Sequence, residues 1–137
     1  MVVENQLELK NVTQVLVSDT RGALAYVSSR FYGDPSRKLT VIGVTGTNGK
    51  TTTTHYVKSI IEASGKQAGL IGTLGHAIGP TTISDRYTTP EASYLQSYLA
   101  GMLGQGITFA VMEVSSHAIA LKRVNHCLLY TSPSPRD

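Results

Sequence analysis

The residues best suited to chemistry lie in one short loop, where two glycines precede a lysine and two threonines. The loop has the sequence Val44-Thr-Gly-Thr-Asn-Gly-Lys-Thr-Thr52. Gly46 and Gly49 allow a tight turn in which several backbone N–H groups point at one anion. Lys50 can reach terminal phosphates, Thr51 can offer its hydroxyl to Mg²⁺, and Thr52 can bond a phosphate oxygen. The spacing of the glycines departs from the ordinary Walker motif, so the loop is a variant.

An alternative interpretation of this loop is a glycine-rich turn with an exposed lysine and no ligand. Three features favour phosphate binding instead. The loop follows an apolar run, it opens a segment with helical periodicity, and it carries the lysine together with the paired threonines. A helix that starts here adds the positive end of its dipole. The sequence therefore predicts a phosphate site at residues 46–52.

A second group of polar residues, Glu113-Val-Ser-Ser-His117, follows the apolar run Ile107–Met112. Ligands of an open parallel sheet gather beyond the carboxyl ends of its strands. Glu113 at such an end can hold Mg²⁺ that bridges phosphates, although by itself it would be an ordinary surface carboxylate. Ser115 can cap the next helix or donate to a ligand. We interpret His117 as a structural or supporting histidine, because adjacent residues rarely aim at one another as a catalytic pair.

A third signal is the sequence Thr88-Thr-Pro-Glu91, which predicts the N-terminus of a helix. Thr89 is a suitable N-cap, and Pro90 suits the first helical position. A helix start by itself explains this pattern. Free N–H groups beside two hydroxyls would also suit an anion or a sugar.

Three apolar runs predict the strands that position these motifs: Leu39–Val44, Ala68–Ile71 and Ile107–Met112. The first and the last are typical of strands buried on both faces. Helical segments separate the strands, and this order implies right-handed crossovers and a parallel sheet. Residues 72–89 are rich in Gly and Thr and are predicted to form a loop.

Two predicted helices connect these strands, and each has an apolar face. The first ends at Gly65, and its apolar residues are Tyr56, Val57, Ile60 and Ile61. The second ends at Gly104, and its apolar residues are Tyr94, Leu95, Tyr98, Leu99, Met102 and Leu103.

Ahead of the sheet, Val12–Val17 predicts a strand, and residues 23–31 predict a helix that stops at Gly33-Asp-Pro35. One strand and one helix cannot form a core. We therefore expect residues 1–38 to be the end of a larger N-terminal α/β domain.

The composition excludes several classes of protein. The chain has 137 residues, a net charge of +3, 41% hydrophobic residues and 15% charged residues. It is too apolar for disorder and too poor in cysteine for a disulfide scaffold. No apolar run approaches the roughly 18 residues of a membrane span, and Lys and Arg are too scattered for a nucleic-acid surface. We expect no nucleic-acid or membrane partner.

The segment Cys127–Asp137 breaks abruptly with the composition that precedes it. One permitted back-translation matches a transposase-type sequencing adapter over its whole length, and the alternative is a natural Ser/Pro-rich terminus. We expect residues 127–137 to be a non-native tail that makes few contacts with the sheet. Cys127 should then have no redox or catalytic role.

The three motifs together resemble the Mur ligases, and the resemblance covers about residues 12–125. The glycine-rich loop marks only the wider superfamily, which includes folylpolyglutamate and cyanophycin synthetases. The Glu-Val-Ser-Ser-His motif is most similar to the branch that adds the third peptide residue to UDP-N-acetylmuramoyl-dipeptide. The fold implied is α/β, with residues 39–126 forming a partial parallel sheet of the ATP-binding central domain.

The resemblance also implies roles for individual residues. ATP would be bound by Gly46, Thr47, Asn48, Gly49, Lys50, Thr51 and Thr52. Thr51 and Glu113 would hold Mg²⁺, and Lys50 and Glu113 would serve catalysis. The UDP-N-acetylmuramoyl-dipeptide would be bound by Thr88, Thr89, Ser115 and Arg123. Leu121 stands where some members have glutamine and cannot make that polar contact.

The function implied is that of a cytoplasmic ATP-dependent amide ligase of peptidoglycan synthesis. Such a ligase converts the D-glutamyl carboxylate to an acyl phosphate, which the amine of a diamino acid attacks. The residues themselves support only the phosphoryl-transfer half of this chemistry. Members have three domains, so we expect a fragment that is inactive by itself, from a monomeric parent. The alternatives are another ligase of the superfamily or a non-catalytic nucleotide-binding module, and the choice of lysine or diaminopimelate stays open.

Overall fold

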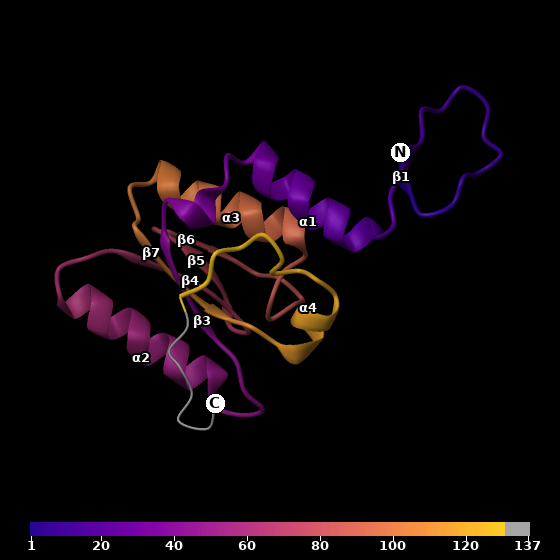
Figure 1. Cartoon of the computed structure of the whole chain (residues 1–137). Coiled ribbons are helices and arrows are strands. Elements are labelled where there is room, and N and C mark those ends of the chain that lie inside the picture. Colours follow the sequence, from indigo (N-terminus) through magenta and orange to yellow (C-terminus); the bar gives the residue numbers. More distant parts are fainter. Residues whose placement is uncertain (131–137) are drawn as a thin grey trace.

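The computed structural model describes residues 1–130 and places a five-stranded sheet between helices (Figure 1). In chain order the elements are β1 (Val2–Val3), β2 (Val15–Leu16), α1 (Thr20–Phe31), the 3₁₀ helix η1 (Pro35–Arg37), β3 (Thr40–Val44), α2 (Lys50–Ala63), β4 (Ala68–Gly72), β5 (Gly75–Ile78), β6 (Thr81–Ile83), α3 (Ala92–Gly104), β7 (Phe109–Glu113) and α4 (Ser116–Ala120). No described helix is both long and apolar enough to cross a membrane.

The central sheet has the strand order β3-β7-β4-β5-β6. β3, β7 and β4 are parallel, as the sequence predicts, and β5 and β6 extend the sheet as antiparallel strands. The prediction that residues 72–89 form only a loop is therefore wrong. Val44 pairs with Glu113, and Ile71 pairs with Met112. This register places the carboxyl ends of the three parallel strands side by side, at the same end of the sheet.

Helices cover both faces of this sheet (Figure 1). The main core lies on the α3 side, where Leu95, Leu99 and Met102 are fully buried. α1 packs against α3 and ends at Phe31, just before the predicted stop.

α2 contacts the opposite face of the sheet, but its inward stripe differs from the predicted one. Tyr56 and Ile60 are exposed, and the buried residue is Thr54. The stripe that contacts the sheet runs through residues 54, 57, 58 and 61, so half of the predicted apolar face points to solvent.

β3 lies at the edge of the sheet, so the prediction that it is buried on both faces is wrong. Within the strand only Val41 is buried. Tyr130 forms a parallel bridge with Ile42, and its N–H donates to the Val41 carbonyl at 2.6 Å. The expectation of few contacts is thus wrong for residues 127–130, since Cys127 also packs on the core. Residues 131–137 lie outside the described part of the chain.

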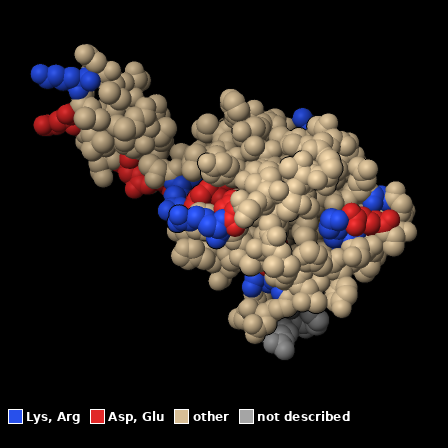
Figure 2. All heavy atoms as spheres, turned by 180° about the vertical axis from the view of Figure 1, so that it is seen from behind, with Lys and Arg blue, Asp and Glu red and all other residues tan. Residues whose placement is uncertain are grey.

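β1 and β2 form a separate two-stranded parallel sheet that extends away from the body beyond α1 (Figure 1). The predicted strand Val12–Val17 is shortened to Val15–Leu16. Charged side chains gather at the neck between this extension and the body, and most of the remaining surface in this view is uncharged (Figure 2). Two ion pairs join α1 to the body, Asp19 with Lys122 and Arg21 with Glu91.

Candidate functional site

The glycine-rich loop connects β3 to α2, as the sequence predicts. Gly46 has φ 147° and Gly49 has φ 79°, backbone conformations that L side chains rarely adopt. α2 begins at Lys50, and its N-cap, Gly49, makes no side-chain capping bond. The N–H groups of the first helical turn have no acceptor within a helix, so they can receive an anion here.

Lys50 lies over the loop that it follows. Its Nζ donates to the Gly46 carbonyl at 2.8 Å, with the Thr47 carbonyl at 3.5 Å. The loop carbonyls therefore hold the ammonium group beside the free N–H groups of the helix. The predicted contact of Lys50 with a terminal phosphate stays a prediction, which this placement beside the helix N-terminus favours.

The Glu113 carboxylate ends β7 and is 1% exposed. One oxygen, Oε2, accepts hydrogen bonds from the hydroxyls of Thr51 at 3.0 Å and Thr73 at 3.1 Å. The other, Oε1, accepts from the Thr73 N–H at 2.9 Å. No cationic side chain among residues 1–130 forms an ion pair with it. A buried carboxylate served only by neutral donors is costly to keep charged, and a cation would offset that cost.

The donor set at Glu113 fits Mg²⁺. The Thr51 hydroxyl and Glu113 Oε2 are 3.0 Å apart. Adjacent ligands of an octahedral Mg²⁺ at about 2.1 Å are also about 3 Å apart. No group of three His, Cys, Asp or Glu gathers anywhere in residues 1–130. The few protein ligands suit Mg²⁺, which takes its remaining ligands from water and substrate phosphates.

Gly72 makes room for this carboxylate. A Cβ built on Gly72 would lie 2.4 Å from Glu113 Oε1. Thr73 follows Gly72 at the end of β4 and supplies two of the three hydrogen bonds to Glu113. Thr73 was not among the predicted site residues, although a hydroxyl two positions after the predicted parallel strand Ala68–Ile71 was the available signal.

Thr89 is not the N-cap of α3, because the helix begins at Ala92 with Glu91 as its N-cap. Its buried hydroxyl instead donates to the Glu113 carbonyl at 2.8 Å and accepts from the Ser115 N–H at 3.1 Å. Thr89 thus ties the loop before α3 to the end of β7. Its predicted contact with substrate stays a prediction.

Thr88 and Ser115 lie at the same edge of the sheet. The Thr88 hydroxyl is 3.0 Å from the Thr73 hydroxyl. Ser115 caps α4, where its hydroxyl accepts from the Ala118 N–H at 3.1 Å, so the predicted capping role is confirmed. His117 is exposed on α4, so it is not a packed histidine, and its interpretation as a supporting residue stays a prediction.

Arg123 reaches the site but is enclosed, with 5% of its surface exposed. Its guanidinium donates to the Thr89 carbonyl at 3.0 Å and pairs with Glu91 at 2.7 Å. The Tyr87 ring covers it, 4.3 Å from the guanidinium carbon. Arg123 therefore holds the start of α3, and its predicted contact with substrate stays a prediction.

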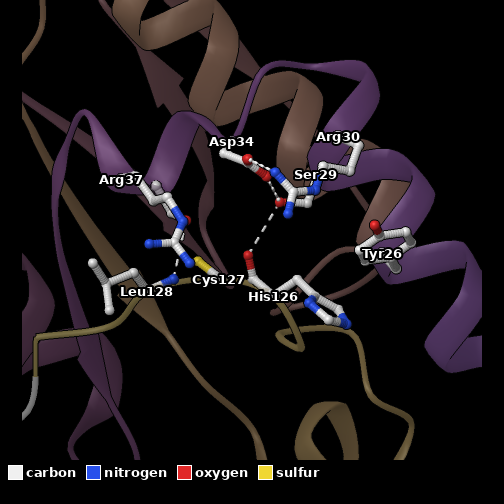
Figure 3. Close-up of a pocket in the computed structure, with 9 residues that line it drawn as sticks. Tyr26, Ser29, Arg30, Asp34, Arg37, His126, Cys127 and Leu128 are labelled. Carbon is white, nitrogen blue, oxygen red and sulfur yellow. Dashed lines mark hydrogen bonds and ion pairs between the residues drawn. The ribbon is translucent and has the colours of Figure 1, made fainter.

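A separate hollow of about 200 Å³ lies between α1, η1 and residues 126–128 (Figure 3). Asp34 accepts a hydrogen bond from the Ser29 hydroxyl at 2.8 Å and pairs with Arg30 at 2.7 Å. The Ser29 hydrogen bond, and then the charges of Arg30 and Arg37, lower the pKa of Asp34 despite its partial desolvation. This hollow is lined by α1 and η1, and it shares no residue with the phosphate loop.

Known protein families show which family has this fold and this loop. Residues 44–132, more than half of the chain, match the family described as "Mur ligase middle domain". The chain belongs to the Mur ligase family. The predicted α/β fold with a parallel-rich sheet is confirmed as that of the Mur ligase middle domain.

Relatives within the Mur ligases are similar to most of this chain. A Caldanaerobacter subterraneus protein is 48% identical over 120 residues, which are 88% of this chain and 25% of the relative. A Halalkalibacterium halodurans protein is 49% identical over 127 residues, 93% of this chain and 26% of the relative. Both are named UDP-N-acetylmuramoyl-L-alanyl-D-glutamate–2,6-diaminopimelate ligase.

A solved structure of a ligase with this name superposes with a TM-score of 0.79 at 32% identity. The match covers 92% of this chain and 26% of that structure. The resemblance to the branch that adds the third peptide residue is therefore confirmed. The chain spans about a quarter of the length of the relatives it matches.

Proposed function

We propose that the protein to which this chain belongs is an ATP-dependent amide ligase of peptidoglycan synthesis. It would add the third amino acid to UDP-N-acetylmuramoyl-dipeptide. The observation that carries the proposal is the buried Glu113 carboxylate, which lies 3.0 Å from the Thr51 hydroxyl at the end of the phosphate loop. A carboxylate and a hydroxyl placed in this way suit a magnesium-bound nucleoside triphosphate.

The phosphoryl-transfer half of the reaction follows from this chain's own residues. The loop from Gly46 to Thr52 would bind the phosphates of ATP through its N–H groups and the helix dipole. Lys50 would place its charge on the terminal phosphates, and Thr51 and Glu113 would hold the metal. Mg²⁺, when bound, supplies charge neutralisation between neighbouring phosphates. The contribution of the protein is thus positioning and electrostatic stabilisation.

The ligation half rests on the relatives. An oxygen of the D-glutamyl carboxylate would attack the terminal phosphorus and form an acyl phosphate, with release of ADP. The amine of the incoming amino acid would then attack the acyl carbon, form the amide bond, lose a proton and release phosphate. Thr88, Thr89, Ser115 and Arg123 would bind the UDP-N-acetylmuramoyl-dipeptide. We propose 2,6-diaminopimelate as the amino acid, because the relatives are named for it.

The domain assignment is part of this proposal. Residues 1–38 would end a UDP-binding N-terminal domain, which the separate β1–β2 sheet supports. Residues 39–126 would form the first part of the ATP-binding central domain, and residues 127–137 would be a non-native tail. The whole ligase would act as a cytoplasmic monomer.

Binding of a nucleotide by the 137-residue chain tests the first half. Isothermal titration with a non-hydrolysable ATP analogue should show binding that requires Mg²⁺. Lys50→Ala should weaken this binding, whereas Lys58→Ala, on the same helix, should not. Nucleotide binding that is equally strong without Mg²⁺ and in Lys50→Ala would contradict the phosphate-site assignment.

A chimera tests the second half. The segment of the Halalkalibacterium halodurans ligase that matches this chain would be replaced by residues of this chain. We expect ligation of a diamino acid to UDP-N-acetylmuramoyl-dipeptide, with ADP released. A chimera that melts like its parent and binds both ATP and the dipeptide, yet forms no amide, would overturn the proposal in favour of a non-catalytic nucleotide-binding module.

A further inference from the structure

His76 belongs to β5, and its fully buried side chain lies between the sheet and α3. Its Nδ1 accepts a hydrogen bond from the Gly72 N–H at 3.3 Å. Since Nδ1 is the acceptor, the ring proton lies on Nε2. Nε2 lies 3.5 Å from Asp85 Oδ2, a proximity that does not meet hydrogen-bond geometry, and it is buried without a hydrogen-bond partner among the described residues. The two sides of one imidazole therefore reach two separate segments of the chain.

Asp85 continues this connection toward the loop before α3. Its Oδ1 accepts a hydrogen bond from the Tyr87 N–H at 3.1 Å. The next residue, Thr88, has its hydroxyl 3.0 Å from that of Thr73. Thr73 directly follows Gly72, the residue whose N–H donates to the histidine. The contacts thus close into a ring, hereafter the His76 ring, formed by residues 72, 73, 76, 85, 87 and 88.

The His76 ring touches the candidate site at two places. Thr73 belongs to the ring and donates two hydrogen bonds to the Glu113 carboxylate. Tyr87 belongs to the ring and covers the guanidinium of Arg123 at 4.3 Å. One side of the ring therefore faces the proposed metal ligand, and the other faces the proposed dipeptide-binding residues.

We propose that His76 is a positioning residue, which together with Asp85 holds the Thr88 segment in register with Thr73 and Glu113. This proposal rests on the proposed function, because it assigns His76 to the dipeptide end of the same site. His76 itself touches no proposed ligand. It acts by fixing two segments that are separated by the β5–β6 hairpin, so that their hydroxyls meet beside the carboxylate.

Two variants break the ring at the same link. His76→Asn keeps an acceptor for the Gly72 N–H but loses the contact with Asp85. Asp85→Ala removes that contact from the solvent-facing side and leaves the buried imidazole in place. Tyr94→Phe is the matched control, because Tyr94 lines the same surface hollow as Asp85 but takes no part in the ring.

The first experiment needs no ligand. Nitrogen NMR of the 137-residue chain should find the His76 proton on Nε2. Asp85→Ala deletes the acceptor of the Tyr87 N–H itself, so the informative variant is His76→Asn, which should speed hydrogen exchange at the Tyr87 amide by about 2- to 10-fold. Tyr94→Phe should leave that exchange rate unchanged. A proton on Nδ1, or unchanged exchange at the Tyr87 amide in His76→Asn, would overturn the proposal.

The second experiment measures two affinities in the same variants, made in the chimera described above, because residues 1–38 are only the end of the proposed UDP-binding domain. Binding of UDP-N-acetylmuramoyl-dipeptide should weaken about 2- to 10-fold in His76→Asn and in Asp85→Ala. The double variant should lose no more than Asp85→Ala alone, because Asp85→Ala already lacks the contact that His76→Asn breaks. Binding of the magnesium–ATP analogue should weaken less, and melting temperatures should stay close to that of the unmodified chimera.

The outcomes separate this proposal from the proposed function. If the unmodified chimera binds neither ligand, the proposed function fails, and the ligand-free experiment still decides whether His76 holds the two segments. If the exchange results hold but dipeptide affinity is unchanged in both variants, His76 has only a structural role and the proposal is wrong. Additive losses in the double variant would also contradict a single shared link.

Discussion

Replacement of Glu113 by glutamine separates two effects of the buried charge, its cost to the stability of the fold and its proposed role in binding Mg²⁺. The side chain keeps its shape, and its oxygen can still accept from the Thr73 N–H. The new amide nitrogen would stand where Oε2 accepts from the hydroxyls of Thr51 and Thr73. Both hydroxyls can rotate to accept, so all three hydrogen bonds can re-form. Without magnesium, we therefore expect a free energy of unfolding that is unchanged, or raised by about 1–2 kcal/mol because an uncompensated buried charge is gone.

The same change should remove the cation site. A contact between a charged group and its ligand is worth roughly 1.5–3 kcal/mol, or about a 10- to 150-fold change in affinity. Glu113→Gln should therefore bind the magnesium–ATP analogue at least about 10-fold more weakly. Glu62→Gln is the matched control, because Glu62 is an exposed carboxylate on α2 that pairs, among residues 1–130, only with Lys58.

Thermal melts and isothermal titrations with and without Mg²⁺ measure both effects. The expected pattern is a melting temperature that is unchanged or raised without Mg²⁺, combined with weak nucleotide binding. A variant that melts far below the unmodified chain in the absence of Mg²⁺ would show that the charge itself stabilises the fold. Unchanged nucleotide affinity would refute the metal-ligand role.

Three further outcomes follow from the same geometry. Lys50→Ala should weaken nucleotide binding by about 10- to 150-fold. His117→Ala, on the exposed face of α4, should change nucleotide binding little. Equal losses of affinity in titrations of the two variants would contradict this division of roles. Gly72→Ala should lower the free energy of unfolding by about 1–3 kcal/mol in denaturant melts, because its Cβ would lie 2.4 Å from Glu113 Oε1. Burial raises the pKa of the Cys127 thiol to about 11, so the stability from burying the neutral thiol should be lost as pH rises toward 11. Alkylation of Cys127 by iodoacetamide should accordingly be slow at pH 8, and fast labelling of the folded chain would contradict its burial.

The sequence by itself was sufficient for the features that depend on local chemistry. The phosphate loop was predictable because two residues with positive φ require glycine and because lysine and threonine follow at the start of a helix. The three parallel strands were predictable from their apolar runs. Ser115 was predictable as a cap because capping depends on a hydroxyl within a few residues of its own N–H partner.

Other features depended on partners that are distant in the chain. β5 and β6 are short, contain Gly and Thr, and exist because they pair with β4, so their local composition resembled that of a loop. α2 turns Thr54 toward the sheet, whereas hydropathy alone predicted that the buried face of the helix would include Tyr56 and Ile60.

The detailed site was decided by the tertiary structure. Glu113 meets Thr51 across 62 positions of the chain and Thr73 across 40. The positions of Glu113 and Thr51 at the same end of the sheet were predictable from the sequence. The number of hydrogen bonds to Glu113, and the absence of a cationic partner for it in residues 1–130, were not. The same holds for Arg123, for which the family resemblance implied a substrate contact and which the fold encloses between Tyr87 and Glu91. Burial and hydrogen-bond satisfaction depend on every segment that surrounds a group, and only folding brings those segments together.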